Sequence, residues 1–270
     1  MLILLSNTAN QRAAHMEQRL PMNFVWLLAG ALGLTNCAVY MPMQCAAPTV
    51  RGKGQVELTG SFYFNSRLEF GANYSPVRHL LVRAAGGGIS DKADSSYRRG
   101  SQYEVALGTY WPLGKQVLVG ALGGFGQAHS EARYKDGVGI FSRPVQYQFD
   151  VRYKKIFGEA YATVGLGPAV SLGLAYRFTQ VQFISLTNLG HPVNVGNMLR
   201  GEPMLFVRGA FGNSPHGERP VYAQFGIGTS QVLNQLWAPW DPGPVAQVLQ
   251  SRVYFTLGLG LALSTLTRRP

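Results

Sequence analysis

The sequence predicts an all-β chain that closes into a single antiparallel up-and-down barrel spanning a membrane, with about ten strands; eight or twelve also fit. Three observations favour this fold class. Short stretches alternate apolar and polar residues along most of the chain, only 14% of the 270 residues are charged, and the connections between stretches alternate between short and long. Alternating strands joined in this way are typical of transmembrane barrels.

The clearest strand runs from Val145 to Lys154. Its odd positions are apolar or aromatic, and its even positions, including Gln146 and Asp150, are polar or charged. A period of two indicates a strand with one apolar and one polar face. We expect the apolar face to contact lipid and the polar face to line a lumen.

Composition agrees with a membrane barrel. The mean hydropathy is +0.02, because alternating strands cancel in any average. The net charge of +11 could indicate nucleic acid, but the basic residues are scattered and form no dense run. We therefore expect no nucleic-acid partner, and lipid headgroups or loop solvation account for the charge.

The N-terminal region predicts export. The apolar run at 24–34 is too short to span a bilayer as a helix and suits a secretory signal peptide, with Met16 or Met22 as possible starts. It ends in Leu34-Thr35-Asn36-Cys37, a lipobox-like tetrapeptide that predicts acylation of Cys37. Cleavage after Gly33 is the alternative. If neither cysteine is processed, Cys37 and Cys45 could form a disulfide.

Four regions follow from these signals. We expect a leader at 1–37, a flexible periplasmic linker at 38–53, the barrel at 54–264 and a C-terminal tail at 265–270.

The first five strands are marked by alternation and turn residues. They are expected at 55–64, 67–74, 79–89, 102–111 and 116–127. Turns at 65–66, 75–78 and 112–115 separate three pairs of them, and proline or glycine marks the latter two turns. Polar loops are expected at 90–101 and from 128 to Pro144.

The remaining five strands are expected at 145–166, 170–183, 203–211, 221–227 and 253–261. The first of these has a break in pattern near 156–158, and the parity of the second changes near Gln180, which predicts a bulge. Loops at 187–201 and 233–248 are long, whereas the turns at 167–168 and 213–218 are short. Long outward loops and short periplasmic turns then place both termini on the periplasmic side.

The polar faces place charged residues in the lumen. The expected lumen network comprises Glu57, Arg67, Glu69, Arg83, Glu104, Asp150, Arg152, Lys154, Arg177 and Arg208. A barrel of about ten strands is narrow, and buried charges must be paired, so these groups should meet across the lumen. A structural plug of salt bridges, a narrow polar pore and a small-ligand cavity all remain open.

Other motifs carry less chemistry. His129-Ser130-Glu131 brings together a base, a hydroxyl and a carboxylate, but adjacent residues point in different directions. The histidines and cysteines lack metal-ligand spacing, and no nucleotide motif is present, so we expect no cofactor and no metal. Trp237 and Trp240 could enter the headgroup layer or cap the barrel.

Three segments carry a resemblance: LTNC at 34–37, GANYSPVRHLLVRAAGGG at 71–88 and GTYWPLGKQVLVGALGGFG at 108–126. With them, the chain resembles small lipobox-bearing outer-membrane β-barrel proteins of Gram-negative bacteria that have no assigned activity. The resemblance implies a bacterial outer-membrane barrel and transfers no site residues. The sequence departs from the usual aromatic barrel terminus, because it ends in Arg268-Arg269-Pro270.

These features predict a non-enzymatic outer-membrane protein with a structural, adhesive or narrow-channel role. Outer-membrane lipids and the barrel-assembly machinery are the expected partners. Two alternatives stay open: an enzyme acting on lipid or peptide at the extracellular rim, and a soluble, lipocalin-like periplasmic lipoprotein that binds a small apolar ligand.

Overall fold

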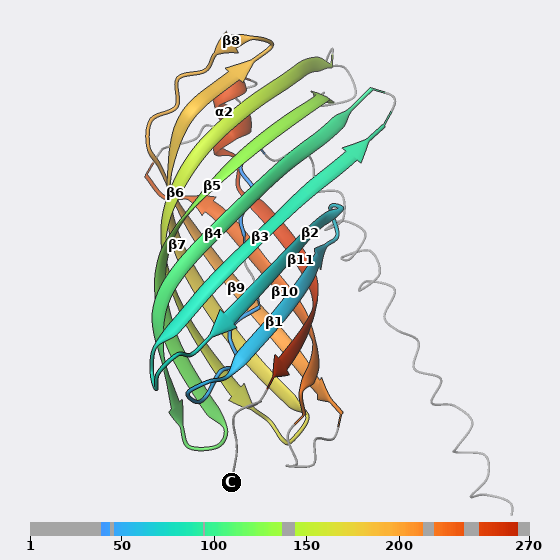
Figure 1. The fold of residues 1–270 in the computed structure, drawn as a ribbon. Helices are drawn as coiled ribbons and strands as arrows, with labels where there is room; N and C mark the ends of the chain where they lie inside the picture. The colour runs from blue at the N-terminus through green and yellow to red at the C-terminus, as the bar shows by residue number, and fades with distance from the viewer. Residues whose placement is uncertain are drawn as a thin grey trace, which may run out of the picture. The chain divides into compact units, whose positions relative to one another are not determined.

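The computed structural model describes residues 39–43, 46–93, 95–136, 144–212, 219–234 and 243–263, all within the compact unit Cys37–Pro270. Within this unit, ten long strands form a tilted barrel (Figure 1). They are β1 (Val56–Tyr63), β2 (Arg67–Tyr74), β3 (Leu81–Lys92), β4 (Tyr97–Leu113), β5 (Val117–Asp136), β6 (Val145–Gly165), β7 (Val170–Asn188), β9 (Met198–Phe211), β10 (Val221–Val232) and β11 (Arg252–Leu263). The short β8 (His191–Pro192) pairs only with β7, and the helix α2 (Pro244–Leu249) precedes β11.

The barrel is closed, and every neighbouring pair of its strands is antiparallel. Consecutive strands pair in order, β7 pairs with β9, and β11 returns to pair with β1. Closure leaves no unpaired sheet edge, which is what a sheet surrounded by lipid requires. The predicted fold class and the count of ten strands are confirmed. Among the described residues, no helix is long and apolar enough to cross a membrane.

The barrel has two unequal ends. The lower end in Figure 1 carries the connections 114–116 and 166–169, and β11 finishes there at Leu263. The upper end carries α2 and β8, together with the extended ends of β4 to β7. Because outward loops are the longer ones in outer-membrane barrels, we take the upper end as extracellular.

Several predicted loops are strand instead. β3 continues to Lys92 and β4 begins at Tyr97, so the loop expected at 90–101 shrinks to 93–96. β5 continues to Asp136, so residues 128–136, which were expected to begin a polar loop, are strand instead. The polar residues that suggested loops belong to strands whose outer face contacts water.

The expected bulge near Gln180 is also displaced. Val181 keeps the inward parity of Thr179 and is fully buried, so the strand does not change face there. The register shifts further along, between Arg152 and Tyr153, where Ser185 and Phe183 are their partners and Ile184 is the extra residue. An unpaired extra residue of this kind is a β-bulge.

Apolar side chains cover the outside of the lower barrel. Exposed large apolar residues occur on nine of the ten long strands, all except β3. They include Leu58, Phe70, Leu107, Phe125, Ile156, Leu172, Phe178, Leu205, Ile227, Leu257 and Leu259. Their neighbours along each strand point inward and are buried. A continuous apolar outer surface is stable only against lipid, so this belt is the membrane-spanning part of the barrel.

Above the belt the outer surface becomes polar. The outward side chains of adjacent strands form rows: Val105, Phe125 and Ile156 lie side by side, and the next row up is Tyr103, Gln127 and Lys154. Higher still come His129 beside Arg152 and Glu131 beside Asp150. We call this polar surface, formed by outward residues of β4 to β7 above the row of Phe125, the upper wall.

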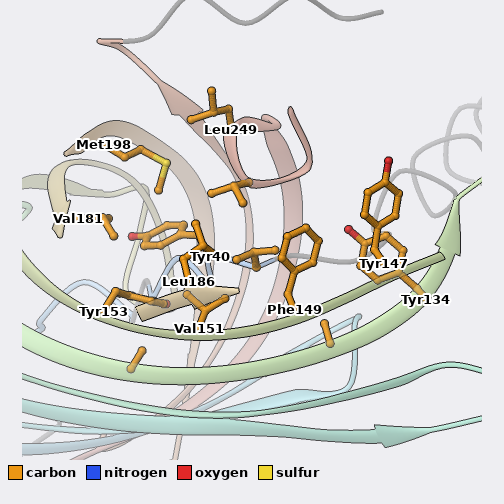
Figure 2. Packing of buried hydrophobic residues seen from close by; sticks show 14 residues of the cluster. Tyr40, Tyr134, Tyr147, Phe149, Val151, Tyr153, Val181, Leu186, Met198 and Leu249 are labelled. Atoms are coloured by element: carbon orange, nitrogen blue, oxygen red, sulfur yellow. The ribbon is translucent and has the colours of Figure 1, made fainter. Parts of the chain in front are cut away.

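The interior changes in the opposite sense. Behind the upper wall lies an apolar core that includes Tyr147, Phe149, Val151 and Tyr153 of β6 and Leu249 of α2. In Figure 2 Tyr40 lies among Tyr153, Val151, Leu186 and Met198, and Tyr147 lies farther away, beyond Phe149. In its lower part the barrel therefore has an apolar outer surface and a charged interior. In its upper part the outer surface is polar and the interior is apolar.

This inversion corrects the interpretation of the stretch at 145–154. Phe149 and Tyr153 point inward, whereas Asp150, Arg152 and Lys154 face outward. Beyond Lys154 the strand keeps its parity but changes environment, so Ile156 faces lipid while Lys155 and Glu159 face the lumen. The break in pattern near 156–158 is this crossing of the membrane boundary.

Glycines make room for aromatic rings on the inner wall. Each of Gly173 and Gly260 lies opposite an inward aromatic residue on the next strand, Phe206 and Tyr222 respectively. An added Cβ would lie 2.0 Å from the ring in both cases. Rings that cover cross-strand glycines fill the lumen and help to set the register of the strands.

Candidate functional site

The lumen holds a continuous network of buried ions. Arg83 of β3 bonds to Glu159 of β6 at 3.0 Å, and Arg177 of β7 bonds to the other oxygen of Glu159 at 2.6 Å. Arg177 also contacts Glu104 of β4 at 2.9 Å, and Glu104 pairs with Lys155. Four strands are thus linked through the lumen by groups that water barely reaches.

A bridge of polar atoms extends this network to β2. Lys155 donates to the Gln102 amide oxygen at 3.1 Å, and the Gln102 amide nitrogen donates to Glu69 at 3.5 Å. Glu69 pairs with Arg67 at 3.0 Å and accepts a hydrogen bond from Tyr63. Each carboxylate therefore has at least one cation or hydroxyl partner, as buried charges require.

Two smaller clusters occupy other levels. Glu202 of β9 accepts hydrogen bonds from Ser230 and Thr179, and Ser230 in turn accepts one from Arg200 at 2.7 Å. Lower down, Glu57 accepts a bond of 2.7 Å from the Tyr222 hydroxyl and one of 2.8 Å from the Asn73 amide.

Seven of the ten predicted lumen residues lie where they were expected. Glu57, Arg67, Glu69, Arg83, Glu104, Arg177 and Arg208 are buried inside the barrel. Asp150, Arg152 and Lys154 are not in the lumen but on the upper wall, because they lie above the membrane boundary. The candidate acylation residue Cys37, together with Cys45, Trp237 and Trp240, lies outside the described residues.

Sequence reasoning missed Lys155, Glu159, Arg200 and Glu202. The first two share the odd parity of Phe149 and Tyr153, which we expected to face lipid, so the expected pattern placed them outside the lumen. The other two lie at the start of β9, in a segment that was expected to be loop. Arg200 and Glu202 have the parity of Arg208, which was expected in the lumen, and that parity is the signal that could have found them.

The main occupant of the lumen is the chain itself. We call residues 39–43 and 46–50 the lumen segment. Its apolar side chains are fully buried, with Tyr40 2%, Met43 0% and Val50 2% exposed. The sequence suggested a flexible periplasmic linker here, but alternation cannot reveal a segment whose partners are the inner faces of distant strands.

Hydrogen bonds seat the lumen segment along the barrel axis. Near its upper end, the Met41 amide donates to the Tyr153 hydroxyl at 3.3 Å. Guanidinium groups then donate to three of its carbonyls: Arg67 to Pro42 at 2.6 Å, Arg83 to Ala46 at 3.1 Å and Arg208 to Ala47 at 2.7 Å. At the lower end, Thr49 donates to Glu57 through its amide and its hydroxyl.

Some buried polar atoms at the contact between the lumen segment and the barrel wall have no hydrogen-bond partner among the described residues. Buried polar atoms without a hydrogen-bond partner in the described part of the chain include the Tyr40 hydroxyl and the Nε atoms of Arg67 and Arg208. All three belong to groups at the contact between the lumen segment and the wall. Burial is the main cause that holds the pKa of Tyr40 well above its ordinary value, so this side chain stays neutral.

His129 does not belong to the lumen or to a loop. It lies on β5 and faces outward, 3.0 Å from Asp150 and 3.6 Å from Glu131. Ser130 points to the opposite face and is 4% exposed. The base and the hydroxyl are therefore separated by the sheet, and the arrangement offers the His129 ring no hydroxyl from Ser130 to activate.

No protein-family model matches this chain, and no curated protein matches it either. Solved structures with similar arrangements are outer-membrane barrels. The translocator domain of the autotransporter NalP from Neisseria meningitidis has a TM-score of 0.44 at 11% identity, over 93% of this chain and 97% of that one. The outer-membrane protease OmpT from Escherichia coli has 0.42 at 10%, over 78% and 94%. The N-terminal barrel of Pseudomonas aeruginosa OprF has 0.32 at 9%, over 78% and 99%.

Similarity at this level says nothing about activity. The fold rests on the chain's own strand pairing and on its apolar belt, and this is the architecture of outer-membrane β-barrels.

Proposed function

We propose that this chain forms a narrow polar channel in the bacterial outer membrane, held shut by its own N-terminal segment. The observation that supports this best is the lumen segment, a stretch of main chain seated inside the barrel. A barrel whose lumen is filled by side chains alone has no room for a peptide. Here the lumen holds one, so its departure would leave a passage.

The wall charges support the same function. The ion pairs among Arg83, Glu159, Arg177 and Glu104 join wall to wall. The lumen segment adds no charged group to the guanidinium groups, only backbone carbonyls and the Tyr40 ring, 4.9 Å from the Arg200 guanidinium. The wall therefore keeps its own pairing when the segment leaves. Water entering the lumen would replace the lost carbonyls and reach the unsatisfied Nε atoms, which lowers the cost of opening.

The lumen segment also blocks the upper part of the lumen, through the side chain of Tyr40. The ring lies among the side chains of the apolar core behind the upper wall, next to Tyr153 at a ring-centroid distance of 5.5 Å (Figure 2). Withdrawal of the lumen segment would take this ring out of the core. One movement would then open both the charged middle and the apolar upper part of the lumen.

Single-channel recording in planar bilayers tests the proposal. We expect the full chain to be silent most of the time, because the segment blocks the lumen. Replacing Tyr40, Met41 and Met43 together with glycine removes the buried apolar anchors and should give frequent, small conductance steps. Val77, Leu80 and Leu113 are exposed, and their replacement with glycine is the matched control.

A folded triple variant that stayed silent over the whole voltage range would exclude the channel. The structural role would then stand, with the segment as a permanent part of the core.

An adhesive role is favoured by one separate feature, the upper wall. There the strands β4 to β7 extend beyond the membrane, and their outward side chains include charged ones.

The proposal is non-enzymatic and includes lipidation. The residue proposed to be acylated is Cys37 of the lipobox-like tetrapeptide. Incorporation of labelled palmitate into the wild-type chain but not into Cys37→Ser is the expected result. Equal labelling of both would remove Cys37 as the acylated residue.

A further inference from the structure

A cavity lies at the lower end of the barrel, between the end of the lumen segment and the strand ends. Its volume is about 410 Å³, within the range of small-molecule sites. Inward residues of β6, β7, β9 and β10 form its inner wall, among them Thr163, Ser171, Arg208 and Tyr222. It opens between the turns of this end, where Arg51 and Lys115 are exposed.

The charges around this cavity are unequal. Four cations line it, Arg51, Lys115, Arg208 and Arg219, against the single carboxylate of Glu57. None of the four forms an ion pair with a carboxylate in the described part of the chain. Arg51 and Arg219 reach only backbone carbonyls, at 3.4 Å for Val117 and 3.3 Å for Ala210.

The single charge of Glu57 offsets only part of the four cations, and Glu57 forms no ion pair with any of them among the described residues. Its oxygens accept hydrogen bonds from Thr49, Asn73 and Tyr222, as described above. Arg208 is the innermost cation at 5% exposed, and its Nε atom has no hydrogen-bond partner among the described residues. Arg208 lines the cavity without a carboxylate partner in the described ranges of the chain, and a guanidinium in that position favours an anion.

We infer that this cavity is a periplasm-facing binding site for a small phosphate-bearing solute. Arg208 and Arg219 would hold the phosphate oxygens, since the planar guanidinium suits paired hydrogen bonds to phosphate. Arg51 and Lys115 supply charge at the mouth. The volume leaves room beside the phosphate for a small polar group, which Thr163, Ser171 and the Tyr222 ring would contact.

The site does not require the lumen segment to leave. Arg51 belongs to the chain just after that segment and forms part of the cavity only while the segment is seated. Binding is therefore a property of the closed barrel, and it can be measured whether or not the channel proposal holds.

Titration calorimetry on the full chain in detergent micelles at low salt tests the site. Glucose 1-phosphate and inorganic phosphate should bind, the former more tightly, and glucose should not. We expect Arg219→Gln and Arg51→Gln each to weaken glucose 1-phosphate binding about tenfold, the usual consequence of losing one charged hydrogen bond. Lys135→Gln, at the opposite end of the barrel, is the control.

Two results would overturn the inference. One is the absence of heat with both phosphates on a folded wild-type chain. The other is equal affinity of the wild type and the Arg51→Gln/Arg219→Gln double variant, which would place any phosphate elsewhere. Both substituted residues lie outside the strands, so the urea-unfolding midpoint should match that of the wild type and show that the barrel is intact.

Discussion

Glu159 is the residue on which most of the lumen network converges. It pairs with two arginines from different strands, Arg83 and Arg177, and is fully surrounded by protein. Desolvation opposes every buried ion, so such a group stabilises the fold only while its partners are in place. Removing the carboxylate charge would leave two buried guanidinium groups short of a counterion.

We therefore expect Glu159→Gln to destabilise the barrel by about 3–5 kcal/mol, the usual cost of breaking a buried pair. The measurement is equilibrium unfolding in urea with the protein in micelles. Asp91→Asn is the matched control, since Asp91 pairs with Arg98 where both are partly exposed and such pairs contribute about 0–1 kcal/mol. Equal effects of the two substitutions would show that the network adds nothing beyond an ordinary surface pair.

At the scale of the strand, the main feature is the change of environment along β5 and β6. Both strands keep one parity from end to end, while their outer residues pass from Phe125 to Gln127 and from Ile156 to Lys154. The change occurs at the same row of the sheet on both strands. A row shared by neighbouring strands is what the edge of a lipid layer requires.

Leu107 lies below this row on the outer face of β4 and is 62% exposed. Leu107→Lys should destabilise the barrel by about 2–4 kcal/mol in lipid vesicles, because a charge there faces acyl chains. Gln148→Lys, on the upper wall, should change stability by less than about 0.5 kcal/mol. Unfolding in vesicles measures both, and a harmless Leu107→Lys would mean that the belt does not lie in lipid.

The sequence located most strands but misjudged their ends. Polar residues such as Arg99 and Arg133 suggested loops because a strand was expected to have an apolar outer face throughout. Above the membrane that expectation fails, since the outer face there meets water. The apolar inner face at Phe149 was accordingly taken for a lipid-facing one.

At the scale of the whole molecule, the barrel and its lumen segment form one closed body. Ala47, a residue of the segment, is 0% exposed inside the barrel, and its carbonyl accepts a hydrogen bond from Arg208. If the segment leaves the lumen in the open state, a thiol at position 47 becomes accessible only then.

This gives a direct measure of opening. In a Cys37→Ser/Cys45→Ser background, Ala47→Cys should react slowly with a membrane-impermeant maleimide, and faster once Tyr40, Met41 and Met43 are glycine. Lys115→Cys, at an exposed turn, should react at once in both cases. Labelling of position 47 at the same rate with and without the glycine substitutions would show that the segment does not move as a gate.

The sequence by itself determined the barrel and the shared polar face of Arg83, Glu104 and Arg177 in the lower part of the wall, because a period of two assigns each residue to one face of a local strand. It favoured ten strands but also allowed eight or twelve. Only the tertiary structure decided which face meets lipid at each height, how the ions pair, and that residues 39–43 and 46–50 lie inside. Those outcomes depend on contacts between strands far apart in the chain, and on where a closed sheet passes from lipid into water, which no local pattern records.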